Sequence, residues 1–153
     1  MKILIVGSGG VGGFFGAMLY RGGHDVLFMA RGEHLKSMLA DGLQVESVVP
    51  GNFTVKNLTA TQNPDGTWKA DLALFCVKSY SNEEAIEAMR PAVGPQTLIL
   101  TLQNGIGSGD ALAAAFGRST VCLCFYFWTN IIKSPRPPPL QQAPVFSSLL
   151  VHL

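Results

Sequence analysis

A glycine-rich segment close to the N-terminus constrains the fold more than any other feature of this sequence. The segment Gly7-Ser8-Gly9-Gly10-Val11-Gly12 directly follows an apolar run, Ile3–Val6, and leads into Val11–Tyr20, where apolar side chains recur at helical spacing. A short apolar run that ends in glycine is typical of a strand buried on both faces. The order strand, glycine turn, helix therefore predicts the first unit of a parallel α/β sheet.

Strand and helix patterns alternate through the first 117 residues. Further strands are predicted at Asp25–Ala30, Leu43–Val49, Phe53–Leu58, Asp71–Val77 and Thr97–Leu102, and further helices at Glu33–Ala40, 82–89 and Asp110–Phe116. Ser81 is expected to cap the helix at 82–89, with Glu84 as its capping-box partner. Strands that alternate with helices pair in parallel through right-handed crossovers. The predicted fold class is therefore α/β, a Rossmann-type doubly wound, mainly parallel sheet.

The spacing of the glycines, G-x-G-x-x-G, indicates a chemistry as well as a fold. Gly7 would permit a tight turn, Gly9 would let the backbone approach a pyrophosphate, and Gly12 would let the helix pack closely on the strand. The free N–H groups and the dipole at the start of a helix favour an anion. We therefore predict that the cofactor-binding residues of this loop are Gly7, Ser8, Gly9, Gly10, Val11 and Gly12, which would hold a dinucleotide. A glycine turn of purely structural use is the alternative, and a P-loop is excluded because no Gly-Lys-Ser/Thr follows.

The residue after the second predicted strand bears on the choice of coenzyme. Enzymes that use NAD usually place Asp or Glu near this point, where the carboxylate accepts a hydrogen bond from the ribose 2′-hydroxyl. This chain has Arg31 there instead, after Ala30. A guanidinium can bind a 2′-phosphate with two hydrogen bonds. Arg31 therefore predicts NADP (NADPH) as the cofactor, with a solvated surface arginine as the alternative.

Two further segments lie where later strands are predicted to end, the edge at which open α/β sheets bind ligands. Lys78 stands in Cys-Val-Lys-Ser-Tyr, and Asn104 stands in Leu-Gln-Asn-Gly-Ile-Gly. Each segment has a simpler interpretation, a solvated loop lysine in one case and a plain turn in the other. Both become more informative beside the glycine motif.

Together these features resemble the ketopantoate reductase family over about residues 1–118. The resemblance rests on Gly7–Gly12, Arg31, Lys78 and the segment at 102–107. It implies NADPH-dependent reduction of a small-molecule 2-oxo acid, 2-dehydropantoate, to pantoate in pantothenate biosynthesis. It also implies that Arg31 binds the 2′-phosphate and that Lys78 lies by the cofactor as a candidate catalytic residue. Asn104 would be the catalytic residue that positions substrate and nicotinamide, near the ribose.

The sequence departs from that family after residue 118. Family members continue into a helical domain that supplies the catalytic lysine and a substrate-binding acid, whereas all 17 glycines and all 10 acidic residues here lie within residues 1–117. The expected organisation is a dinucleotide-binding domain at 1–118 and, at 119–153, an extra strand (121–127) and an irregular Pro-rich tail. We interpret the tail as the product of a truncation or a frameshift, and do not assign the general-acid role to Lys133. We expect the chain alone to be inactive.

Composition narrows the remaining function classes. A net charge of +1 argues against nucleic-acid and membrane partners, and the apolar run Val121–Trp128 is too short to span a bilayer. The three cysteines and the histidines His24, His34 and His152 show no metal-site spacing, so no metal is expected and the histidines are interpreted as surface or loop residues. A cytoplasmic location is predicted, and a homodimer stays open. The alternatives are a stand-alone NADP-binding or regulatory module, and another 2-oxo acid or sugar-phosphate dehydrogenase of the same plan.

Overall fold

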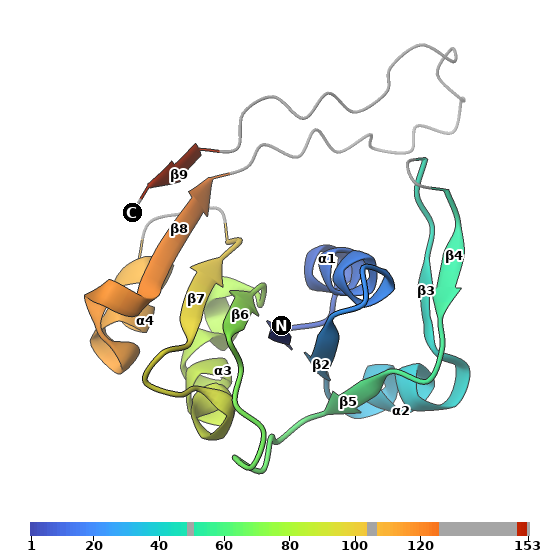
Figure 1. The fold of residues 1–153 in the computed structure, drawn as a ribbon, viewed down its shortest axis with the longest axis horizontal. Helices are drawn as coiled ribbons and strands as arrows, with labels where there is room; N and C mark the ends of the chain where they lie inside the picture. The colour runs from blue at the N-terminus through green and yellow to red at the C-terminus, as the bar shows by residue number, and fades with distance from the viewer. Residues whose placement is uncertain (49–50, 104–106, 126–149, 153) are drawn as a thin grey trace.

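Strands and helices alternate along the chain in a computed structural model that describes residues 1–48, 51–103, 107–125 and 150–152 (Figure 1). The strands are β1 (Lys2–Val6), β2 (Asp25–Met29), β3 (Leu43–Val45), β4 (Phe53–Val55), β5 (Thr59–Thr61), β6 (Leu72–Phe75), β7 (Leu98–Thr101), β8 (Val121–Phe125) and β9 (Leu150–His152). The α-helices are α1 (Gly10–Arg21), α2 (Gly32–Asp41), α3 (Asn82–Met89) and α4 (Ser108–Phe116). Short 3-10 turns lie at η1 (Ser79–Ser81), η2 (Arg90–Ala92) and η3 (Arg118–Thr120).

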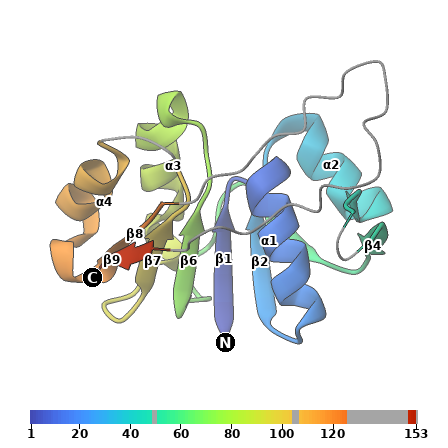
Figure 2. The same cartoon turned by 90° about the horizontal axis from the view of Figure 1, so that it is seen from above.

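The main sheet has the strand order β5-β2-β1-β6-β7-β8-β9, and Figure 2 shows β1 between β6 and β2. Its first six strands pair in parallel, and β9 pairs antiparallel with β8. Numbered along the chain, the six parallel strands run 3-2-1-4-5-6, the order of a doubly wound dinucleotide-binding sheet. The predicted fold class is thus confirmed. The order reverses between β1 and β6, and open α/β sheets bind ligands outside the carboxyl ends of the strands at such a point.

The side chains of β1 alternate between two apolar cores, one on each face of the sheet. Ile3 and Ile5 pack in the core that includes Ala17 of α1. Leu4 and Val6 pack in the other core, below α3 and α4. Figure 1 shows α1 and α3 on opposite sides of the sheet. Burial on both faces explains why β1 reads as an unbroken apolar run.

The region between α2 and β6 differs from the sequence-based prediction. Its two predicted strands are shorter than expected and form a separate antiparallel hairpin, β3 with β4. A further strand, β5, was not predicted, and it forms the edge of the main sheet beside β2. The sequence of β5 is Thr-Ala-Thr, which offers no apolar run. Backbone pairing with β2, rather than a local pattern, makes it a strand.

The sheet continues past the predicted boundary at residue 118, because β8 and β9 both belong to it. The strand β9 lies in the segment predicted to be an irregular tail, so that prediction is wrong for Leu150–His152. A strand was predicted over 121–127, and β8 occupies Val121–Phe125, parallel to β7. The Pro-rich segment and Lys133 fall within 126–149, outside the described residues. The division of the chain into domains at residue 118 stays a prediction.

The capping box predicted at the start of α3 is wrong. Ser81 precedes the helix as expected, but its side chain makes no capping hydrogen bond. Glu84 turns instead to Arg31, which follows β2. A tertiary ion pair has taken the place of the local bond that the sequence pattern indicated.

Candidate functional site

The turn between β1 and α1 brings three elements into direct contact. Gly7 has a φ of +92°, and a Cβ on it would lie 2.7 Å from Cγ1 of Val77, which follows β6. A Cβ on Gly12 would lie 2.1 Å from the carbonyl oxygen of Gly7. Side chains larger than hydrogen at these two positions would therefore separate α1 from the turn and the turn from β6.

Gly9 is under no such constraint from within the chain. Its φ of −73° is accessible to any residue. A Cβ built on it meets no atom of the described structure within 4 Å. The space beside Gly9 is thus open, at the start of a helix whose first turn carries no acidic residue. A diphosphate group fits this arrangement, because its oxygens could approach the backbone N–H groups without meeting a side chain.

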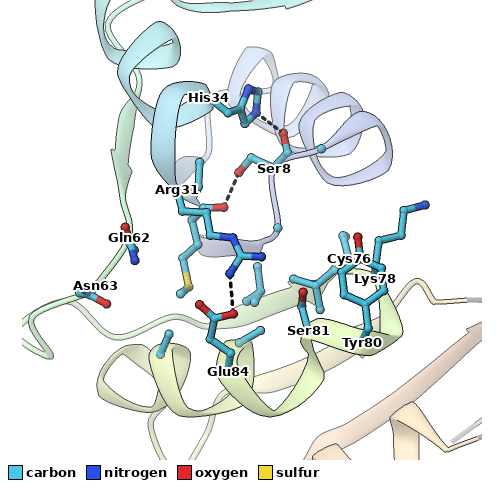
Figure 3. A pocket seen from close by; sticks show the side chains of 18 residues that line it. Ser8, Arg31, His34, Gln62, Asn63, Cys76, Lys78, Tyr80, Ser81 and Glu84 are labelled. Atoms are coloured by element: carbon cyan, nitrogen blue, oxygen red, sulfur yellow. Dashed lines mark hydrogen bonds and ion pairs between the residues drawn. The ribbon is translucent and has the colours of Figure 1, made fainter.

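A cavity of about 370 Å³ lies outside the carboxyl ends of β1, β2 and β6 (Figure 3). Residues 6–9, 29–31 and 76–78 line it from the sheet, and side chains of α3 and of the preceding 3-10 turn line it from the opposite side. Its volume lies within the range typical of small-molecule pockets. Of the loop residues predicted to hold a dinucleotide, Gly7, Ser8 and Gly9 line this cavity, while 10–12 form the first turn of α1.

Ser8 and His34 hold the glycine turn from two sides. The N–H and the hydroxyl of Ser8 both donate to the carbonyl of Met29, at 3.1 and 3.0 Å. The Nε2 of His34 donates to the carbonyl of Ser8 at 2.8 Å. Because a carbonyl only accepts, His34 carries its hydrogen on Nε2. Ser8 therefore uses its donors to anchor the turn to β2.

His34 is a site residue that the sequence interpretation missed. The sequence predicts an ordinary surface or loop histidine, and His34 is indeed exposed, but it also lines the cavity and binds the glycine turn. The one available signal was its position, three residues after Arg31 in the first turn of a helix.

Arg31 pairs with Glu84 across the cavity, as Figure 3 shows. The Nη1 of Arg31 lies 2.5 Å from Oε2 of Glu84, and the two side chains are 59% and 63% exposed. The hydrogen bond and the charge of Glu84 raise the pKa of Arg31. Sequence reasoning singled out Arg31 as a binding residue but assigned Glu84 only to helix capping, because the two lie 53 positions apart.

The later strands bring Lys78 to the same cavity. Lys78 follows β6, and its side chain extends away from Arg31 (Figure 3). Asn104, predicted for the nicotinamide end, falls outside the described residues. Its neighbour Gln103 is described, and its Nε2 donates to the carbonyl of Val77 at 2.5 Å and to Oδ1 of Asn82 at 2.8 Å. Gln103 thus ties the end of β7 to the end of β6.

Nucleophilic and metal chemistry find little support in the described part of the chain. Burial raises the pKa of the Cys76 thiol from 9.0 to about 12, so this cavity-lining group stays protonated near neutral pH and is a poor nucleophile. Within the described ranges, no three His, Cys, Asp or Glu side chains gather in a way that could hold a metal ion. None of the described helices is both long and apolar enough to cross a membrane.

Comparison with known proteins decides the family. Residues 3–136 match the family model for ketopantoate reductase PanE/ApbA. The chain belongs to this family. The described cavity therefore lies at the strand ends of a ketopantoate reductase fold.

The proteins that this chain resembles are considerably longer than the chain itself. The 2-dehydropantoate 2-reductase of Aquifex aeolicus is 31% identical over 134 residues, which cover 87% of this chain and 41% of that protein. The crystal structure of 2-dehydropantoate 2-reductase from Geobacter metallireducens superposes with a TM-score of 0.78 at 36% identity, covering 88% of this chain and 44% of that one. A D-mandelate dehydrogenase structure with NADH and anilino(oxo)acetate has a TM-score of 0.78 at 26% identity, covering 84% and 42%. The chain spans less than half the length of each of these proteins.

Proposed function

We propose that this chain is the NADPH-binding part of a 2-dehydropantoate 2-reductase. The observation that carries the proposal is the glycine turn at the reversal of strand order. There, Gly7 and Gly12 are required by packing, while Gly9 faces open space. A glycine that the fold does not need, at the start of a helix and beside a cavity, is best explained by a ligand whose phosphates approach the backbone.

The charges around the cavity support a phosphorylated ligand. The positive end of the α1 dipole lies by Gly9, and no acidic side chain in the first turn of that helix opposes it. Arg31 follows β2 and lines the cavity, and in this proposal its guanidinium binds the 2′-phosphate of the adenosine ribose. Lys78 adds a second cation to the cavity lining.

Family resemblance assigns the reaction itself. When bound, the nicotinamide would supply a hydride to the carbonyl carbon of the 2-oxo acid. The resemblance assigns Asn104, which lies outside the described residues, to that end of the coenzyme. Within this proposal the present chain binds and orients the coenzyme, and the general acid is a lysine of the family's second domain. Turnover would then need that domain, because the negative charge that develops on the ketone oxygen during hydride transfer requires a proton donor. We place the reaction in the cytoplasm, where the free thiol of Cys76 stays reduced.

A second candidate is reduction of a different 2-oxo acid with NADH. The D-mandelate dehydrogenase that shares this fold was solved with NADH and anilino(oxo)acetate. The carboxylate of Glu84 beside Arg31 is compatible with a coenzyme that lacks the 2′-phosphate. The choice of coenzyme and the choice of substrate are therefore separate questions.

The test is a fluorescence titration of NADPH with the parent chain, Gly9→Ala and Gly94→Ala. Gly94 is a matched control, because its Cβ would make only ordinary contacts, the nearest at 3.7 Å to Oγ1 of Thr97. We expect Gly9→Ala to weaken NADPH binding about tenfold or more, since a methyl group would occupy the approach to the backbone. Gly94→Ala should bind as the parent does. Equal NADPH affinity for all three proteins would refute the assignment of the glycine turn.

A further inference from the structure

The cavity contains a carboxylate that the sequence argument for NADP did not include. At the position after β2 where NAD enzymes usually have Asp or Glu, this chain has Arg31. The fold brings Glu84 to the same place from α3, on the far side of β1. Both side chains line the cavity and pair there, as the dashed line in Figure 3 shows.

We propose that Glu84 sets coenzyme discrimination in this site by competing with the coenzyme's 2′-phosphate for Arg31. The inference rests on the proposed function, because it assumes that a nicotinamide dinucleotide occupies the cavity. Glu84 is then a specificity-determining residue that lowers the preference for NADPH over NADH.

The free protein gives the first reason for this effect. Glu84 already engages Nη1 of Arg31, and the pKa of Arg31 is raised by that bond and by the carboxylate charge. A phosphate that binds the guanidinium must share it with Glu84 or displace that carboxylate. In either case part of the attraction between Arg31 and the phosphate is offset.

The complex gives the second reason. A 2′-phosphate on Arg31 would lie close to a carboxylate that contacts the same guanidinium, and the two anions would repel each other. An unphosphorylated ribose brings no such charge. Its 2′-hydroxyl could instead donate to the Glu84 carboxylate, as it does to the acid that NAD enzymes usually carry after β2. Glu84 therefore acts in opposite directions on the two coenzymes.

Glu83 provides a matched control for the charge of Glu84. Both residues lie in the first turn of α3 and both are exposed. Glu84 lines the cavity and pairs with Arg31, whereas Glu83 is outside the cavity lining. Glu84→Gln and Glu83→Gln remove the same charge from the same helical turn, so a difference between them reports the contact with Arg31.

The experiment measures Kd for NADPH and for NADH by fluorescence with the parent, E84Q and E83Q, at low and high salt. We expect E84Q to increase the ratio Kd(NADH)/Kd(NADPH) about three- to tenfold at low salt, since the charge repulsion is removed and a neutral amide competes less strongly for Arg31 than a carboxylate does. E83Q should change the ratio less than about twofold, and high salt should reduce the difference between the variants.

Two results would overturn the inference alone. One is a parent that binds NADPH in a Gly9-dependent way while E84Q and E83Q give the same ratio. The other is a lower ratio for E84Q, which would mean that Glu84 orients Arg31 toward the phosphate. A parent that binds neither coenzyme would overturn both this inference and the proposed function.

Discussion

Replacing Gly12 with alanine should destabilise the fold by an amount that the packing around α1 determines. The new methyl group would lie 2.1 Å from the Gly7 carbonyl oxygen, against about 3.4 Å for ordinary contact, and 3.0 Å from Cβ of Cys76. The start of α1 would have to move by about 1 Å. The helix is held in place farther along, since Ala17 is fully buried and a Cβ on Gly16 would already lie 2.4 Å from the Phe28 ring.

The expected net cost follows from two opposing effects. Overpacking of this kind costs about 1–3 kcal/mol, and contact with backbone rather than a flexible side chain favours the upper end. Alanine recovers about 0.5–1 kcal/mol through its higher helix propensity. The free energy of unfolding should therefore fall by about 2 kcal/mol, which lowers Tm by about 4–8 °C in a chain of this size.

Thermal unfolding monitored by circular dichroism measures this change, with Gly9→Ala as the control. Gly9 needs no positive φ and has open space at its Cβ, so Gly9→Ala should keep the Tm of the parent or raise it slightly. An unchanged Tm for Gly12→Ala would contradict the close packing of α1 on the glycine turn.

Three other outcomes are expected. Cys76 should react slowly with a thiol reagent in the native protein and rapidly in urea, because burial raises the pKa of its thiol from 9.0 to about 12. The stability that the protonated thiol contributes is therefore complete below pH 9 and declines as the pH rises toward 12. Cys76→Ala should reduce that decline when the free energy of unfolding is measured by urea titration across this pH range. Arg31→Ala should leave the free energy of unfolding nearly unchanged, since the ion pair with Glu84 is exposed to solvent, and should make the affinities for NADPH and NADH similar. A retained preference for NADPH would contradict the role of Arg31. The buried hydroxyl of Thr97 donates to the Ala70 carbonyl at 2.6 Å and accepts from the Gly94 N–H at 2.8 Å. Thr97→Val should therefore lower the free energy of unfolding, measured by chemical denaturation, by about 1–3 kcal/mol. A loss below about 0.5 kcal/mol would contradict the importance of these two bonds.

The local sequence pattern was sufficient to predict the elements whose conformation depends on neighbouring residues in the chain. The run Ile3–Val6 predicts a strand buried on both faces, and the glycine motif predicts the turn that follows it. The reason is that backbone sterics and side-chain periodicity act over a few residues. The family resemblance rested on the same local segments, and it is confirmed over residues 3–136.

Contacts between residues far apart in the chain determined the features that the local sequence pattern could not predict. The strand β5 exists because β2 offers it a pairing edge, and His34 belongs to the site because its ring reaches the Ser8 carbonyl. Glu84 leaves the local capping role for an ion pair with Arg31 because the parallel crossovers place the ends of β2 and β6 on either side of β1. Such partners lie 26 to 53 positions apart along the chain, so their meeting depends on the topology of the sheet rather than on any local propensity.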